Sequence, residues 1–224
     1  MFTSSRRSLE FGLAAAASVL CSIALVAPSA ASAATQEDKT QFGVTAGTLS
    51  FLAAPGLPGL GTVTLNGKAQ TTNAIMNAFE VADATGTGAG WNVTVEGQTG
   101  AGKSAVFAAY CAKAKCGTEA EGYVTGGATL PANSLTLNST GATFEGQNGS
   151  TGTAPALQCA AACNVDSKTA VKVVSAAKEA GMGSWLTKGF TATSLALTTP
   201  STLKTLPNEE IYRVNVMWTL STGP

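Results

Sequence analysis

The chain contains no histidine, and this absence excludes several kinds of chemistry at once. Histidine is the commonest general base, a member of the Ser-His-Asp triad and the commonest zinc ligand. A hydrolase would therefore depend on carboxylates. We assign two close acidic pairs, Glu119 with Glu121 and Glu209 with Glu210, to solvated loops, because two-carboxylate catalysis depends on a spatial separation that sequence does not show. We predict that the protein is not an enzyme and uses no cofactor.

Charge is also scarce. The chain has 13 basic and 13 acidic residues. Arg6, Arg7 and Glu10 belong to an N-terminal segment with the features of an export signal, so the remainder carries 11 basic against 12 acidic residues. A nearly neutral surface argues against nucleic acid or an anionic membrane as partner. It suits a neutral or mixed-charge polymer such as a glycan.

Long hydrophobic runs are absent except near the N-terminus. There, Arg6 and Arg7 precede an apolar stretch at 11–26, and Ala31-Ser-Ala33 is a small-residue cleavage site. These features predict that residues 1–33 are a signal peptide. The general secretory route is favoured, and the twin-arginine route stays open. The stretch is too short for a permanent membrane helix, so we expect no membrane span after signal removal.

The rest of the chain is rich in Gly, Ser, Thr and Ala, with short β-branched runs. Residues 34–40 are polar and charged and are predicted to be a mobile leader. Residues 41–224 are predicted to form one all-β domain. We expect a single β-sandwich or barrel-like domain of about 8–10 short strands with long Gly/Ser/Thr-rich loops.

Period-2 patterns and turn residues predict the individual strands. Asn66-Gly67 predicts a hairpin turn, and 139–141 is predicted to be the turn of another hairpin. Residues 170–177 fit a strand or a helix, and the alternation of Val171 and Val173 favours the strand. The remaining predicted strands are 42–51 with a break at Gly47, 62–65, 79–82, 91–95, 135–138, 142–145, 190–197 and 211–220.

Four cysteines follow the export segment: Cys111, Cys116, Cys159 and Cys163. An even number in an exported protein favours two disulfides. We expect Cys111–Cys116 and Cys159–Cys163, because short loops close first, while the two crossed pairings stay open. A four-cysteine metal site is disfavoured by the spacings and by an oxidising compartment.

Residues 97–104, Gly-Gln-Thr-Gly-Ala-Gly-Lys-Ser, match the phosphate-binding P-loop pattern in full. A P-loop NTPase would also need an apolar strand ending in a magnesium-binding Asp and repeated strand–helix alternation. The sequence shows neither, so we interpret the segment as a Gly-rich turn.

Two strands carry related tryptophan motifs. The last strand alternates apolar and polar residues and contains Trp218-Thr-Leu220, and an earlier one contains Trp91-Asn-Val93. A tryptophan on an alternating strand is usually part of the core. Its ring is also suited to stacking on sugars.

These segments resemble the WxL-domain surface proteins of Gram-positive bacteria. The resemblance covers 78–95 (a strand ending in Asp83, a polar turn, then Gly-Trp and a second strand), Ala177–Trp185, Leu195–Pro200 and Tyr212–Pro224. We expect Asp83 to cap the turn and not to bind calcium. Val93 stands where leucine would match the family more closely.

The resemblance implies an extracellular protein that holds noncovalently to peptidoglycan or another cell-wall glycan. It implies Trp91, Val93, Trp218 and Leu220 as the binding residues, with Trp185 structural, and other WxL-locus surface proteins as partners. We expect Trp91, at a strand start, to be more exposed than Trp218. The alternative function is a secreted structural subunit or adhesin that binds a protein partner.

Overall fold

The computed structural model describes residues 37 and 39–224. The predicted signal peptide and its cleavage site lie outside the described residues, as does most of the predicted leader. The chain divides into a unit ending at Gly43 and a unit from Val44 to Pro224. In the first, Glu37 and Lys39 form an ion pair at 3.2 Å. Among the described residues there is no helix long and apolar enough to cross a membrane.

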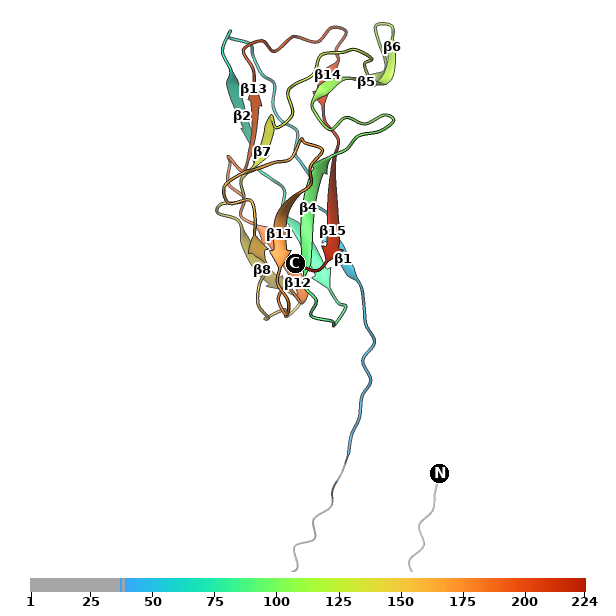
Figure 1. The fold of residues 1–224 in the computed structure, drawn as a ribbon, viewed down its shortest axis with the longest axis vertical. Coiled ribbons are helices and arrows are strands. Elements are labelled where there is room, and N and C mark those ends of the chain that lie inside the picture. Colours follow the sequence, from blue (N-terminus) through green and yellow to red (C-terminus); the bar gives the residue numbers. More distant parts are fainter. Residues whose placement is uncertain (1–36, 38) are drawn as a thin grey trace, which may run out of the picture. The chain divides into compact units, whose positions relative to one another are not determined.

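The second unit is all-β, as expected, and its described strands form four open antiparallel sheets (Figure 1). The described chain has fifteen strands where eight to ten were expected, and four of the fifteen are only two or three residues long. The strands are β1 (Leu49–Ala53), β2 (Gln70–Ala74), β3 (Phe79–Asp83), β4 (Trp91–Gly97), β5 (Ala108–Cys116), β6 (Glu119–Tyr123), β7 (Leu135–Leu137), β8 (Thr143–Gln147), β9 (Ala156–Leu157), β10 (Cys163–Asn164), β11 (Val171–Ala176), β12 (Gly183–Lys188), β13 (Leu195–Thr199), β14 (Ile211–Arg213) and β15 (Val216–Thr222).

Each sheet joins strands from distant parts of the chain. The β4 sheet has the order β15-β4-β11-β9, and the β12 sheet has the order β1-β3-β12-β8. The β13 sheet is β10-β7-β13-β2, and the β5 sheet is β14-β5-β6. In Figure 1 the β12 sheet lies at one end of this unit, and β2, β13 and β14 lie at the other. Strand β4 runs between the two ends.

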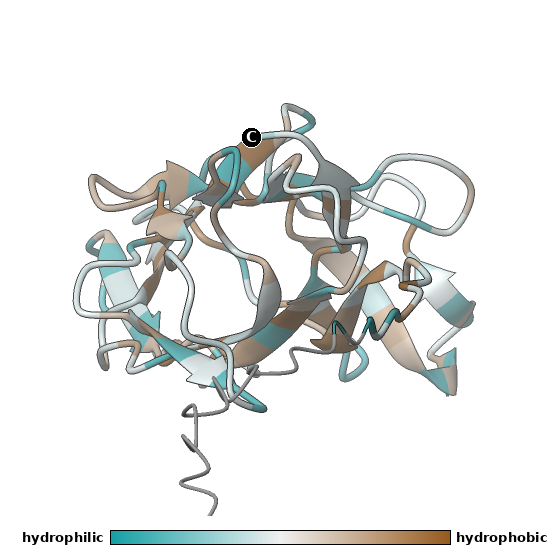
Figure 2. Ribbon diagram, turned by 90° about the horizontal axis from the view of Figure 1, so that it is seen from below, coloured by the Kyte–Doolittle hydropathy of each residue, from teal (hydrophilic) through white to brown (hydrophobic). Residues whose placement is uncertain are grey.

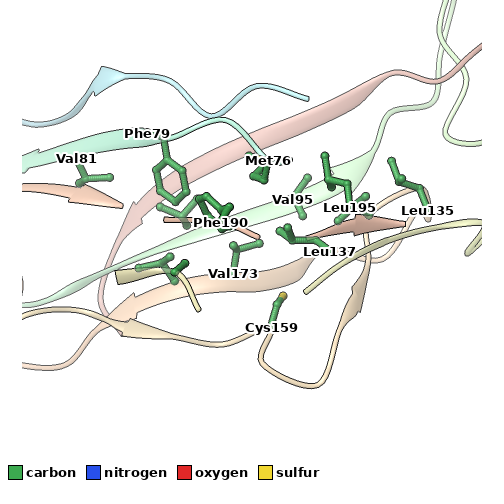
Figure 3. Packing of buried hydrophobic residues seen from close by; sticks show 14 of the residues in the cluster. Met76, Phe79, Val81, Val95, Leu135, Leu137, Cys159, Val173, Phe190 and Leu195 are labelled. Carbon is green, nitrogen blue, oxygen red and sulfur yellow. The ribbon is translucent and has the colours of Figure 1, made fainter. Parts of the chain in front are cut away.

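Alternating apolar residues from three sheets meet in one core. Seen end on, the strands surround a common interior, and hydrophobic and hydrophilic residues alternate along them (Figure 2). Phe79 and Val81 enter from the β12 sheet, Val95 and Val173 from the β4 sheet, and Leu195 from the β13 sheet (Figure 3). Packing of this kind is what a β-sandwich requires.

Several predicted strands are confirmed. Strands β3 and β4 cover 79–82 and 91–95, and β11 settles the ambiguous segment 170–177 as a strand. The strand predicted at 42–51 begins only at Leu49. The amide of Gly47 donates to the carbonyl of Ala84 at 2.8 Å, just after β3 ends, so earlier residues have no partner strand.

Both predicted hairpins are wrong. The side chain of Asn66 accepts a hydrogen bond from the Lys68 amide at 3.0 Å, but residues 62–65 form no strand. The next strand along the chain is β2, which begins at Gln70. Its residues are mostly polar and are extended because they pair with β13. Likewise, the turn at 139–141 connects β7 and β8, which belong to different sheets.

The last two predicted strands have shifted bounds. The strand expected at 190–197 is β13, which begins at Leu195. The strand expected at 211–220 is interrupted at Val214 and Asn215. The Asn215 amide donates to the Ser104 carbonyl at 2.8 Å, and the chain changes there from pairing with β5 to pairing with β4.

Both expected local disulfides are present. Cys111 and Cys116 have Cα atoms 5.7 Å apart, and Cys159 and Cys163 have Cα atoms 5.3 Å apart. The first bridges an irregular stretch of β5, where the register with β6 shifts between Cys111 and Lys115. The crossed pairings are therefore excluded.

Candidate functional site

Three segments that are distant in sequence meet at the N-terminal end of β4. The Trp91 indole Nε1 donates to the carbonyl of Gly181 at 2.9 Å, which ties β4 to the segment before β12. The Gly223 amide donates to the Gly90 carbonyl at 2.9 Å, and the Asn92 side-chain amide donates to the Gly223 carbonyl at 2.7 Å. We call this meeting point the motif junction; it comprises Gly90–Asn92, Gly181 and Gly223.

Glycine is required at two positions of the motif junction. Gly90 has φ +76°, and a Cβ atom there would lie 2.4 Å from the Ala176 carbonyl oxygen. Gly181 has φ +68°, and its Cβ would lie 2.7 Å from Nε1 of Trp91. Both the left-handed backbone and the close approach exclude a side chain. Gly90-Trp91 in one family segment and Gly181 in another, Ala177–Trp185, therefore form the two sides of one contact.

Trp91 and Val93 are buried, with 1% and 0% of their surface exposed. Strand β4 has β15 on one side and β11 on the other, so its inward side chains are covered from both sides. The expectation that Trp91 is the more exposed tryptophan is wrong. A strand start is usually open, but here Gly181 lies against the indole.

Trp218 and Leu220 are half-buried, because β15 is the edge strand of the same sheet. Trp218 lies opposite Val95, and Leu220 lies opposite Val93. The Trp218 ring faces Phe79, with ring centroids 6.4 Å apart and planes tilted by 37°. The two motif tryptophans are thus not paired with each other, since Trp91 lies opposite Thr222.

Two further expectations about this region are confirmed. Trp185 is 6% exposed, and its Nε1 donates to the Met182 carbonyl at 2.9 Å, as expected for a structural residue. Asp83 caps the turn after β3: its Oδ1 accepts from the amide of Thr85 at 3.0 Å and from its hydroxyl at 2.6 Å. Among the described residues there is no cluster of three or more metal-binding side chains.

A family model described as "WxL domain surface cell wall-binding" matches residues 30–224. The chain belongs to the WxL family. It is accordingly a surface protein of a cell-wall-binding family. No curated protein and no solved structure matches the chain.

In the P-loop-like segment of this WxL domain, the amides of Gly97, Gln98 and Lys103 are already occupied. The amide of Gly97 donates to the Ser167 carbonyl at 2.6 Å, and that of Gln98 to the Asn215 carbonyl at 2.8 Å. The Lys103 amide closes the turn onto Gly100 at 3.1 Å. A phosphate cradle needs these amides free, and it needs a following helix, where this chain has β5.

The acidic pairs lie on two different kinds of structure. Glu119 and Glu121 are on β6 and not in a loop, because that segment pairs with the far end of β5. Glu209 lies in a loop and forms an exposed ion pair with Lys113. These acids are spread over the β5 sheet and the adjoining loop.

A groove of about 880 Å³ with a leucine-lined floor opens at the opposite end of the WxL domain from the motif junction; we call it the apolar groove, although Lys204, Glu210 and Arg213 also line it. Its walls are the loop 57–65 and the segment from Leu203 to Val216. Its floor includes the core residues Leu135, Leu195 and Leu197. Sequence reasoning missed this groove, because its walls are loops without a periodic pattern. The run of leucines, prolines and glycines at 55–61 was the available signal.

Tyrosine hydroxyls hold the walls of the groove in place. The Tyr212 hydroxyl donates to the Lys204 carbonyl at 2.9 Å, and the Tyr123 hydroxyl donates to the side-chain oxygen of Asn215. Partial burial raises the pKa of both tyrosines, in spite of a nearby Arg213 that lowers the pKa of Tyr123. Both phenols therefore stay protonated at neutral pH and act as hydrogen-bond donors.

Proposed function

We propose that this WxL domain holds noncovalently to peptidoglycan and that the edge strand β15 makes the contact. Trp218 and Leu220 would touch the glycan, and Trp91 and Val93 would hold β15 in position from the neighbouring strand. The protein would have no catalytic role. The main support for this proposal is a difference in exposure. Of the four motif residues, Trp91 and Val93 are buried, and only Trp218 and Leu220 keep appreciable exposed surface.

Chemistry supports this division of roles. An indole presents a large apolar face with a polar N–H handle, which suits the alternating C–H and hydroxyl surface of a sugar. In contrast, the Nε1 of Trp91 is already used by Gly181. A direct contact through Trp91 would require the motif junction to open.

Wall pelleting tests the proposal. Purified protein without the predicted signal peptide is mixed with peptidoglycan stripped of proteins and teichoic acids, and the bound fraction is measured over a range of protein concentrations. Trp218→Ala and Leu220→Ala should weaken binding, Trp218→Ala by about 1–3 kcal/mol if aromatic stacking on sugars resembles stacking on bases. High salt should change binding little, because the chain is nearly neutral.

Met217→Ala is the matched control, because Met217 is the exposed neighbour of Trp218 on the opposite face of β15. Melting temperatures measured on the same samples separate loss of contact from loss of fold. If Trp218→Ala and Leu220→Ala both fold normally and pellet like the unmodified protein, the assignment to β15 is wrong.

We also propose that residues 1–33 direct export and are removed before Ala34. The support is the charged start, the apolar stretch and the small-residue site in the sequence. Mass spectrometry of the protein recovered from an expressing Gram-positive culture should give an N-terminus at Ala34. Recovery only of the full-length chain in the cytoplasm would contradict export.

A further inference from the structure

We propose that this domain associates head to tail with a second copy of itself. The segment 41–46 of one copy would lie in the apolar groove of the next, with Phe42 and Val44 as anchors. This proposal goes beyond wall binding and does not depend on it. It rests on two surfaces that the described chain leaves uncovered.

The first surface is the segment itself. Phe42 is 91% exposed and Val44 is 84% exposed, the highest values among the large hydrophobic residues of the described chain. They stand two positions apart, so they point to the same side of the chain when it is extended. Residues 40–48 carry no charge, so the segment itself brings no ion into the groove, whose lining already includes Lys204, Glu210 and Arg213.

The second surface is the groove between the loop 57–65 and the segment from Leu203 to Val216. Leu65 and Ile211, which line it, are 44% and 48% exposed. No residue from 54 to 69 belongs to a strand. The groove volume of about 880 Å³ exceeds what two side chains need and also accommodates their backbone.

The segment cannot reach the groove of its own copy. The amide of Gly47 is bonded to the Ala84 carbonyl near the motif junction, and β1 then runs from that end toward the groove. The groove starts at Val216, which lies opposite Gly97, and β4 spans roughly 20 Å from Trp91 to Gly97. Three residues from Gly47 back to Val44 reach at most about 11 Å, so the two anchors cannot both enter the groove of their own copy.

The occupant is therefore another copy, and the contact is heterologous: a different surface is used on each partner. Such contacts propagate into open chains unless the rotation closes a ring. Burying one Phe and one Val gives a small interface, so we expect association that is weak and depends on concentration. A wall surface crowded with copies would favour it.

Sedimentation velocity over a wide concentration range, without cell wall, tests the proposal. The unmodified protein without its predicted signal peptide should form dimers and larger species as concentration rises. F42S/V44S and, separately, I211D should each weaken association by about ten-fold or more. L52S is the control, since Leu52 is 56% exposed on β1 and lies outside both surfaces.

Mixing gives the sharpest readout. F42S/V44S keeps an intact groove and I211D keeps an intact segment, so the two together should form a heterodimer that grows no further. Melting curves confirm that both variants are folded. An unmodified protein that stays monomeric overturns the proposal and leaves the groove to another partner. Association that I211D and a second groove variant, L65D, leave intact also overturns it. Wall pelleting of the monomeric variants reports on peptidoglycan binding separately.

Discussion

The two Trp-x-(Val/Leu) strands lie side by side in one sheet and differ in almost every physical respect. Strand β4 is central, and its Trp91 is 1% exposed and hydrogen-bonded to Gly181. Strand β15 is at the edge, and its Trp218 is half-buried beside Phe79. Similar tripeptides can therefore be buried and hydrogen-bonded in one strand and partly accessible to solvent in the next. The position of a strand in its sheet sets how much of its side chains water can reach.

The largest loss of stability is expected from one of a pair of alanine substitutions, and the pair tests the difference between the two strands. Trp91→Ala removes a fully buried ring and should lower the free energy of unfolding by about 3–5 kcal/mol. Trp218→Ala removes a half-buried ring and should cost about 1–2 kcal/mol. Denaturant unfolding of both variants gives the comparison. Equal losses would mean that β15 is as much part of the core as β4.

A loss similar to that of Trp91→Ala, or slightly smaller, is expected when the backbone of the motif junction is changed. Gly90→Ala combines a left-handed backbone with a collision against the Ala176 carbonyl, and should cost about 2–5 kcal/mol. Gly86→Ala is the matched control, because Gly86 has φ +68° but open space around it, and should cost about 1–2 kcal/mol. Thermal melts of the two variants are sufficient. If Gly86→Ala is the more damaging, the close approach at Gly90 is not what holds β4.

A change of pH perturbs the far end of β4 and leaves both tryptophans intact. Asp166 is fully buried, its Oδ2 accepts from the Ser134 amide at 2.9 Å, and its neighbour Ser167 accepts from Gly97 at the end of β4. Burial raises the pKa of Asp166, although amide hydrogen bonds oppose the shift. The folded state therefore favours the protonated acid. Its stabilising contribution is complete below the unfolded pKa of about 3.9 and is lost as pH rises through the higher folded-state value.

Asp166→Asn cannot titrate and isolates this effect. The melting temperature of the unmodified protein minus that of Asp166→Asn should be larger at about pH 4 than at about pH 7. Each pH unit in which only the folded state is protonated changes the corresponding difference in the free energy of unfolding by up to about 1.4 kcal/mol. The same difference at both pH values would show that Asp166 titrates alike in folded and unfolded chains.

The smallest effect is expected on the outer face of β15. Thr219 is exposed and lies opposite Thr94, so Thr219→Lys should change stability by less than about 0.5 kcal/mol and leave wall binding unchanged. Melting and pelleting of one preparation test both statements. Loss of wall binding in this folded variant would move the contact from the inner face of β15 to the outer one.

Sequence by itself determined the class of this protein. The richness in Gly, Ser and Thr and the short β-branched runs are enough to predict an all-β domain, and the missing histidines and low charge narrow its function. Spacing and compartment predict the two local disulfides, and the tryptophan and glycine motifs predict the family. Each of these depends on residues close together in the chain or on overall composition, so a reader of the sequence has all the information.

Only the tertiary structure decided which motif residues are accessible and which turns make hairpins. Gly67 and the turn at 139–141 look like hairpin turns, but the strands after them pair with partners from elsewhere in the chain, such as β2 with β13. Trp91 is buried because Gly181, ninety residues later, lies against its ring. The apolar groove forms where two unpatterned loops meet. Long-range pairing fixes each of these features, and a local pattern does not specify which distant segment will supply the partner.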